Sequence, residues 1–95
     1  MPRSTEWVGK YDNHVVRVRT EVVETGDDQT LMDFELLVDG DVVDSAQRTI
    51  AGAVFTTVRL TGARAGHNFT AKIRQHIVRA TEIEVRANGR LIDMR

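Results

Sequence analysis

The stretch that decides the fold is Phe34-Glu-Leu-Leu-Val-Asp-Gly-Asp-Val-Val-Asp-Ser45, in which Asp39-Gly40 stands between two apolar runs. An Asp-Gly pair in this setting is the strongest short-range signal for a two-residue β-hairpin turn, because both turn residues need a positive φ. The segment Ile83-Glu-Val-Arg-Ala-Asn-Gly-Arg-Leu-Ile-Asp-Met94 repeats the pattern around Asn88-Gly89. The two copies predict a chain built from two β-meander halves.

Further strands are predicted where apolar side chains recur at every second position. This alternation runs over residues 14–24, 30–38, 50–61 and 68–78. About eight short strands separated by turn signals, with no long helical pattern, predict an all-β antiparallel β-sandwich. A closed or partly closed barrel is the alternative architecture.

The alternation also assigns side chains to the two faces of each strand. Val54 and Ile77 are expected to point inward and His76 outward. Residues 42–44 are expected to form a short strand, residues 45–49 a connector and residues 62–66 a loop. The predicted core consists of Trp7, Val16, Val18, Val22, Phe34, Leu36, Val58, Leu60, Phe69, Ile73, Ile83 and Val85.

The chain length of 95 residues allows one domain, which we expect to span residues 7–95 after a flexible segment at residues 1–6. The absence of cysteine excludes disulfides and thiolate metal sites, and in so small a domain it favours a reducing compartment. The sequence contains neither a signal-peptide pattern nor a run of about 18 apolar residues. A cytoplasmic protein without a membrane partner is therefore expected.

Charge is distributed unevenly along the chain. Residues 1–47 carry 4 Lys/Arg and 11 Asp/Glu, a net charge of −7, whereas residues 48–95 carry 9 Lys/Arg and 3 Asp/Glu, a net charge of +6. This imbalance indicates either a basic face for an anionic partner or acidic and basic strands that pair side by side.

Basic residues gather in the second half of the sequence. Arg59, Lys72 and Arg74 are expected on one outward face, together with the aromatic ring of Phe55. Sheet faces of this composition hold single-stranded nucleic acids. The candidate anion-binding residues are these three, Arg64 in its loop and Arg79 just beyond the strand: Arg59, Arg64, Lys72, Arg74 and Arg79.

Catalytic and metal-binding patterns are absent from the sequence. The three histidines, His14, His67 and His76, are spaced as strand-end residues, and His67 and His76 are expected on opposite faces. Neither Ser4 nor Ser45 lies in a nucleophile elbow. We therefore expect no enzyme activity, no catalytic residue, no metal and no cofactor.

Three apolar residues, Leu31, Leu37 and Val43, stand at positions where the alternation predicts exposure. Such residues suggest a surface that a protein partner or a second copy covers. The expected function is a non-enzymatic interaction module that acts through contacts with a protein partner or with a second copy of itself. The alternative is a polyanion or single-stranded nucleic-acid binder that uses the basic residues.

The order of motifs resembles that of Fas apoptotic inhibitory molecule proteins. The motifs are Trp7, Asp12-Asn-His14, Val38-Asp-Gly40, Gly52, Phe69-Thr-Ala-Lys-Ile73 and Thr81-Glu-Ile-Glu-Val-Arg-Ala-Asn-Gly-Arg-Leu91. Two features depart from that family: Ser45-Ala-Gln-Arg48 replaces an aromatic-rich segment, and no tyrosine precedes Asn88-Gly89. The resemblance implies a non-enzymatic β-sandwich without a cofactor, from a family linked in animals to apoptosis regulation and protection against protein aggregation.

Overall fold

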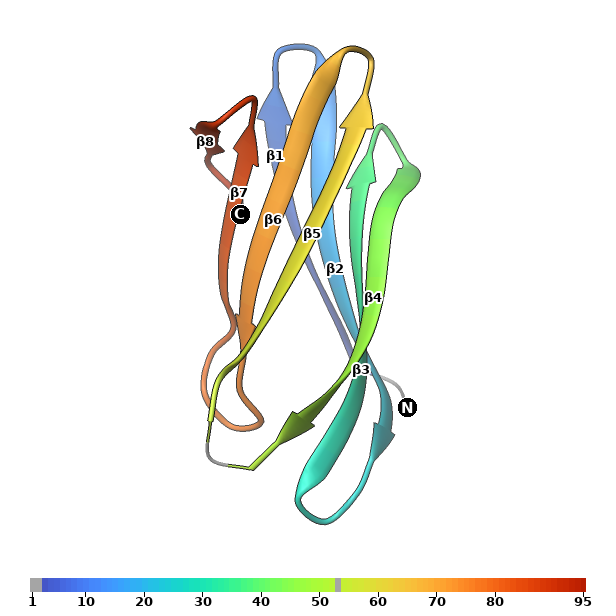
Figure 1. Cartoon of the computed structure of the whole chain (residues 1–95), viewed down its shortest axis with the longest axis vertical. Coiled ribbons are helices and arrows are strands. Elements are labelled where there is room, and N and C mark those ends of the chain that lie inside the picture. The colour runs from blue at the N-terminus through green and yellow to red at the C-terminus, as the bar shows by residue number, and fades with distance from the viewer. Residues whose placement is uncertain (1–2, 53) are drawn as a thin grey trace.

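The computed structural model describes residues 3–52 and 54–95. Eight strands form two four-stranded antiparallel sheets with the orders β1-β2-β3-β4 and β5-β6-β7-β8, so each meander half is one sheet (Figure 1). The predicted β-sandwich is confirmed. The strands are β1 (Ser4–Tyr11), β2 (His14–Thr25), β3 (Gln29–Val38), β4 (Asp41–Ala51), β5 (Thr56–Arg64), β6 (His67–Gln75), β7 (Glu82–Ala87) and β8 (Arg90–Ile92).

Both hairpin turns that the sequence predicts are present. Asp39 and Gly40 have φ values of 52° and 86°, and Asn88 and Gly89 have values of 50° and 83°. A third turn of the same kind joins β5 to β6 at Ala65-Gly66, with φ values of 53° and 80°. The predicted loop at residues 62–66 is thus shorter than expected, because β5 continues to Arg64.

The prediction for the middle of the chain is wrong. Instead of a short strand and a connector, β4 continues to Ala51 and pairs with β3 along its length. The low strand propensity of Ser45-Ala-Gln47 is overridden because β3 offers a full ladder of backbone partners. Since β5 begins only at Thr56, Val54 lies in the link and is exposed rather than inward.

A second correction concerns the end of β6. The strand stops at Gln75, so alternation no longer decides where the next side chains point. His76, expected outward, is buried, whereas Ile77, expected inward, is exposed.

The N-terminal strand begins earlier than the sequence indicated. Ser4 to Glu6, within the segment expected to be flexible, belong to β1 and pair with β2, starting with Ser4 opposite Glu21. Residues 1 and 2 of that segment lie outside the described residues.

The core lies between the two sheets. The predicted core residues are buried, except Trp7, Val22 and Ile83, which are partly buried and pack against it. Further buried apolar side chains that the predicted core did not include are Met32, Leu37, Val38, Ile50, Ala71, Ala87 and Ile92.

Polar contacts join the sheets along both sides. The amide of Val8 donates to the carbonyl of Arg95 and the amide of Arg95 donates to the carbonyl of Val8, both at 2.9 Å. On the other side, the amide of Thr61 donates to the Asp44 carboxylate at 2.8 Å. The edge strands are therefore partly covered by the chain itself. No helix long and apolar enough to span a membrane occurs among the described residues.

Candidate functional site

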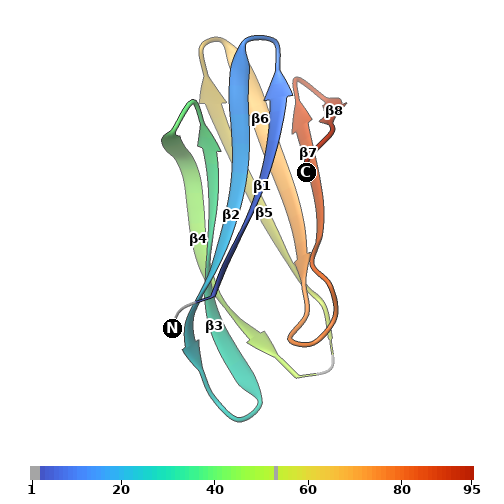
Figure 2. The same cartoon turned by 180° about the vertical axis from the view of Figure 1, so that it is seen from behind.

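The charge imbalance of the sequence becomes a difference between the sheets. Strands of the acidic half pair with one another in the first sheet, and strands of the basic half pair in the second. Acidic and basic strands do not pair side by side in either sheet. Because the sheets pack face to face, their outer surfaces point in opposite directions; Figure 1 has the second sheet in front and Figure 2 the first.

The outer surface of the second sheet carries two cations that lack a carboxylate partner. Arg59 on β5 lies directly opposite Lys72 on β6, and both are exposed. Neither makes an ion pair with another described residue. Glu84 lies directly opposite Lys72 on β7, but its ion pair is with Arg86 at 2.8 Å. Like charges directly opposite each other on a sheet are unfavourable. Arg59 and Lys72 are called the basic face below.

Arg74 lies on the same surface but is largely neutralised. Its guanidinium makes an ion pair with Glu82 at 3.0 Å and lies 4.5 Å from the ring centre of Phe55. This cation–π contact confirms that the arginine and the aromatic ring are neighbours, as the sequence suggested. The net charge available to a ligand is therefore concentrated on Arg59 and Lys72.

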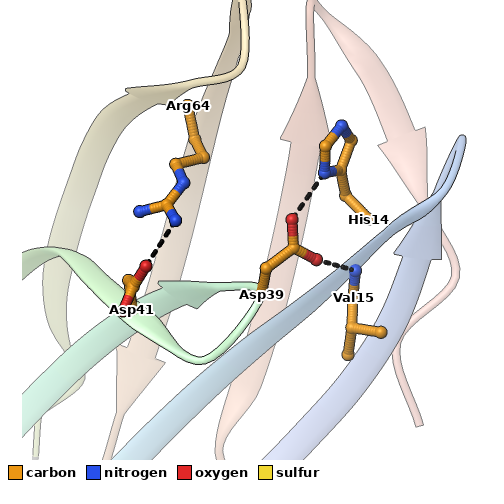
Figure 3. Close-up of polar contacts among 5 residues, drawn as sticks. All are labelled: His14, Val15, Asp39, Asp41 and Arg64. Carbon is orange, nitrogen blue, oxygen red and sulfur yellow. Dashed lines mark hydrogen bonds and ion pairs between the residues drawn. The ribbon is translucent and has the colours of Figure 1, made fainter.

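The remaining two predicted residues lie elsewhere. Arg64, at the end of β5, makes an ion pair with Asp41 at the start of β4 (Figure 3). Arg79 lies in the link between β6 and β7 and is exposed. Only three of the five candidate anion-binding residues thus share one surface, because β6 ends before Arg79 and the sheets meet at Arg64.

The outer surface of the first sheet carries a like-charge pair of the opposite sign. Glu21 on β2 lies directly opposite Asp33 on β3. Both line a shallow groove of about 440 Å³. Among the described side chains, Gln47 alone makes a polar contact with these two carboxylates: its side-chain amide donates to Asp33 at 2.8 Å. Glu21 and Asp33 are called the acidic face below.

Neighbouring charges on the first sheet are balanced. Arg17 pairs with Glu6, and Arg19 pairs with Glu35 at 3.2 Å. The sequence placed Glu21 and the two arginines on the outer surface, but only the strand register shows which charges remain without a partner.

The three apolar residues expected at the surface are less exposed than the alternation predicted. Leu37 is buried under its neighbours on the outer surface, Val43 packs against the core at a bulge, and Leu31 is half-buried.

A polar cluster occupies the end of the sandwich that holds the turn at Asp39. The ring Nδ1 of His14 donates to Asp39 at 2.6 Å, and the amide of Val15 donates to the other carboxylate oxygen at 2.9 Å (Figure 3). The His14 hydrogen bond and then the Val15 amide hold the pKa of Asp39 below its ordinary value of 3.8. The contacts position the hairpin against β2.

Two histidines that the sequence placed on separate strands meet at this end. The ring centres of His14 and His67 are 5.5 Å apart, and the side chain of Asn88 donates to Nδ1 of His67 at 2.8 Å. No cluster of three His, Cys, Asp or Glu side chains suited to a metal ion occurs within the described ranges. The cluster is explained by the turns that it holds together.

Comparisons with protein-family models, curated proteins and solved structures found no match for this chain.

Proposed function

We propose that this chain is a non-enzymatic interaction module that binds a second copy of itself. The basic face of one copy, Arg59 and Lys72, contacts the acidic face of the next, Glu21 and Asp33. The observation that carries the proposal is that each outer surface holds two like charges directly opposite each other, without an ion pair to another described residue, and that the two surfaces differ in sign.

The spacing of the charges supports a direct match. In both pairs the residues lie directly opposite each other on antiparallel neighbours, so their Cβ atoms are roughly 5 Å apart. Two cations at this spacing can contact two carboxylates at the same spacing, and arginine adds bidentate geometry. The contact offsets the like-charge repulsion within both pairs, and the two faces carry complementary charge.

The symmetry of the contact follows from the position of the faces. Because they are on opposite surfaces of one sandwich, the interaction is head-to-tail and extends rather than closing into a two-fold dimer. We expect short, reversible, salt-sensitive stacks of copies, since exposed charges are screened within about 10 Å at 0.1 M salt.

A second candidate function uses the same basic face. This surface also suits a polyanion or single-stranded nucleic acid, because Arg59 and Lys72 lack an ion pair and Arg74 lies beside the ring of Phe55. Two carboxylates on that surface, Glu82 and Glu84, oppose a long anionic ligand, which is why we place self-association first.

The family resemblance and the cytoplasmic location stay hypotheses within this proposal. Both are compatible with a small interaction domain, but neither specifies the surface that it uses.

The test compares two double variants by sedimentation velocity. Glu21→Gln/Asp33→Asn removes the acidic face, and Arg59→Gln/Lys72→Gln removes the basic face. We expect the unaltered protein to form concentration-dependent oligomers at low salt that dissociate at high salt. Each double variant should be monomeric by itself, and an equimolar mixture should form a 1:1 dimer, because each variant retains the face that the other lacks.

The control is Arg90→Gln, which removes an exposed cation from the short strand β8 and should leave association unchanged. A monomeric unaltered protein at all concentrations contradicts self-association. If a single-stranded oligonucleotide then binds the unaltered protein and the acidic-face variant but not the basic-face variant, the second function replaces the first.

A further inference from the structure

A pocket opens at the end of the sandwich opposite the His14 cluster. It has a volume of about 240 Å³ and lies where β6 ends and the link to β7 folds back, at the lower end of the molecule in Figure 1. Its lining comes from both sheets. This volume is below the range of drug-sized pockets, so a ligand would be a small metabolite-sized molecule.

Three apolar side chains lie together in the lining of the pocket. Met32 and Ile50 are buried there, and Val22 is half-buried. An aliphatic chain of a few carbons can contact these side chains in place of water.

Polar side chains also line the pocket, and two of the buried ones carry a free donor. Thr20 is 3% exposed and His76 is 6% exposed. The amides of Val78 and Arg79 donate to Nδ1 of His76 at 3.1 and 3.2 Å, which leaves the ring proton on Nε2. Neither this Nε2–H group nor the Thr20 hydroxyl makes a hydrogen bond to another described residue. Both side chains line the pocket, so each carries a donor that a ligand oxygen could use.

The third buried polar side chain of the lining is already satisfied. The side-chain amide of Gln75 accepts from Thr81 at 2.9 Å and donates to the carbonyl of His76 at 3.0 Å. Thr20 and His76 therefore carry the buried donors left for a ligand, whereas the other threonines of the lining, Thr5, Thr25 and Thr30, are more exposed.

The mouth of the pocket is positively charged. Arg3 and Arg79 stand at its exposed rim, and the described lining contains no aspartate or glutamate. A cleft with one sign of charge concentrates ligands of the opposite sign. Arginine pairs with the planar oxygens of a carboxylate or the oxygens of a phosphate.

We propose that this pocket binds a small aliphatic anion that also carries a carbonyl or hydroxyl oxygen. The anionic group lies between Arg3 and Arg79, and the carbon chain lies on Val22, Met32 and Ile50. The second oxygen accepts from the Thr20 hydroxyl and from Nε2–H of His76. The site does not involve the outer faces and is independent of the proposed self-association.

The first experiment is a two-dimensional NMR titration with four small probes. Levulinate and dihydroxyacetone phosphate have the anionic group and the carbonyl, valerate lacks the carbonyl and methyl propyl ketone lacks the charge. We expect saturable shifts at Thr20, His76 and Ile50 with levulinate, with dihydroxyacetone phosphate, or with both, which identifies the preferred anion. Valerate should bind about tenfold more weakly or not at all, because a buried donor stays unpaired. The ketone should bind more weakly by a similar factor, because the hydrogen bonds to a charged group are lost.

Two variants and a control link the binding to the named groups. Arg79→Gln should weaken levulinate about tenfold without altering the weak binding of the ketone, and Thr20→Val should weaken levulinate but not valerate. Arg90→Gln, a cation at the far end of the molecule, and the basic-face double variant should both bind as the unaltered protein does. The proposal is overturned if neither anion gives saturable shifts, if the ketone binds as tightly as levulinate, or if Arg79→Gln has no effect.

Discussion

At the scale of single residues, positive φ angles at the turns decide how this chain reverses. Asp39, Ala65 and Asn88 occupy equivalent first positions of two-residue turns, with φ between 50° and 53°. Asp and Asn tolerate this conformation and were recognisable in the sequence, whereas alanine tolerates it poorly. The hairpin of β5 and β6 therefore forms because its strands pair, in spite of its turn residue.

Replacing Ala65 with asparagine should stabilise the protein. An L-residue in the left-handed region costs about 1 kcal/mol or more, and asparagine reduces that cost. We expect the free energy of unfolding, measured with urea, to rise by about 0.5–1 kcal/mol in Ala65→Asn. The control is Ala63→Asn, at an exposed position of β5 in the same hairpin that has no positive φ, and it should not raise the stability. An equal rise in both variants would refute the turn explanation.

Asp39 adds a pH-dependent contribution to stability. Its pKa is lowered in the fold from 3.8 by the His14 hydrogen bond and the Val15 amide, so the ionised carboxylate favours the folded state. This contribution is fully present above the ordinary pKa of the carboxyl and is lost as the pH falls through the lowered value. Asp39→Asn keeps a residue that tolerates the turn but removes the charge.

The comparison is a set of urea unfolding curves at several pH values. We expect Asp39→Asn to be less stable than the unaltered protein near neutral pH, and the two stabilities to converge at acidic pH below the ordinary carboxyl pKa. Asp27→Asn, in the exposed β2–β3 loop, is the control and should show no such convergence. A difference that stays constant over the whole pH range would contradict the role of the Asp39 carboxylate.

At the scale of strands, the close approach of β4 to β5 closes one side of the sandwich. A Cβ atom added at Gly62 would lie 2.8 Å from the Cβ and 2.9 Å from the carbonyl oxygen of Val43. Val43 belongs to the bulge of β4 opposite Leu36 and Leu37, so it has little freedom to retreat. Glycine is required at this position by packing and not by its backbone conformation.

Gly62→Ala should therefore destabilise the protein by about 1–3 kcal/mol in chemical denaturation, the cost of overpacking. Gly52→Ala is the matched control, because nothing described lies within 4 Å of its added Cβ, and it should be nearly neutral. An equally small loss of stability in both variants would show that β4 and β5 can move apart at no cost, which would contradict the packing explanation.

At the scale of the whole molecule, the sandwich keeps opposite charges on opposite surfaces. Each outer surface places two like charges directly opposite each other, which lowers the stability of an isolated copy. A favourable contact with another molecule would offset this cost, which links the stability of one copy to its proposed association.

Arg59→Gln should separate the two effects. At low salt and at dilutions where copies do not associate, we expect the free energy of unfolding to rise by about 0.2–1 kcal/mol, because the repulsion of Lys72 is removed. The gain should vanish at high salt. Arg74→Gln, which loses the ion pair with Glu82, should show no gain. A loss of stability in Arg59→Gln would show that Arg59 has a favourable partner within its own chain.

The sequence by itself determined the two hairpin turns, the inward residues of the long strands and the division into two meander halves. These features depend on local φ preferences and on alternation, which neighbours in the chain express directly. The tertiary structure decided the length of β4, the burial of His76 and the meeting of His14 with His67, since each depends on a partner strand or on a chain end that local pattern does not specify. It also decided the surfaces on which both proposals rest. Register leaves Arg59 beside Lys72 and Glu21 beside Asp33, and the packing of the two sheets brings Arg3, Thr20, His76 and Arg79 around one pocket.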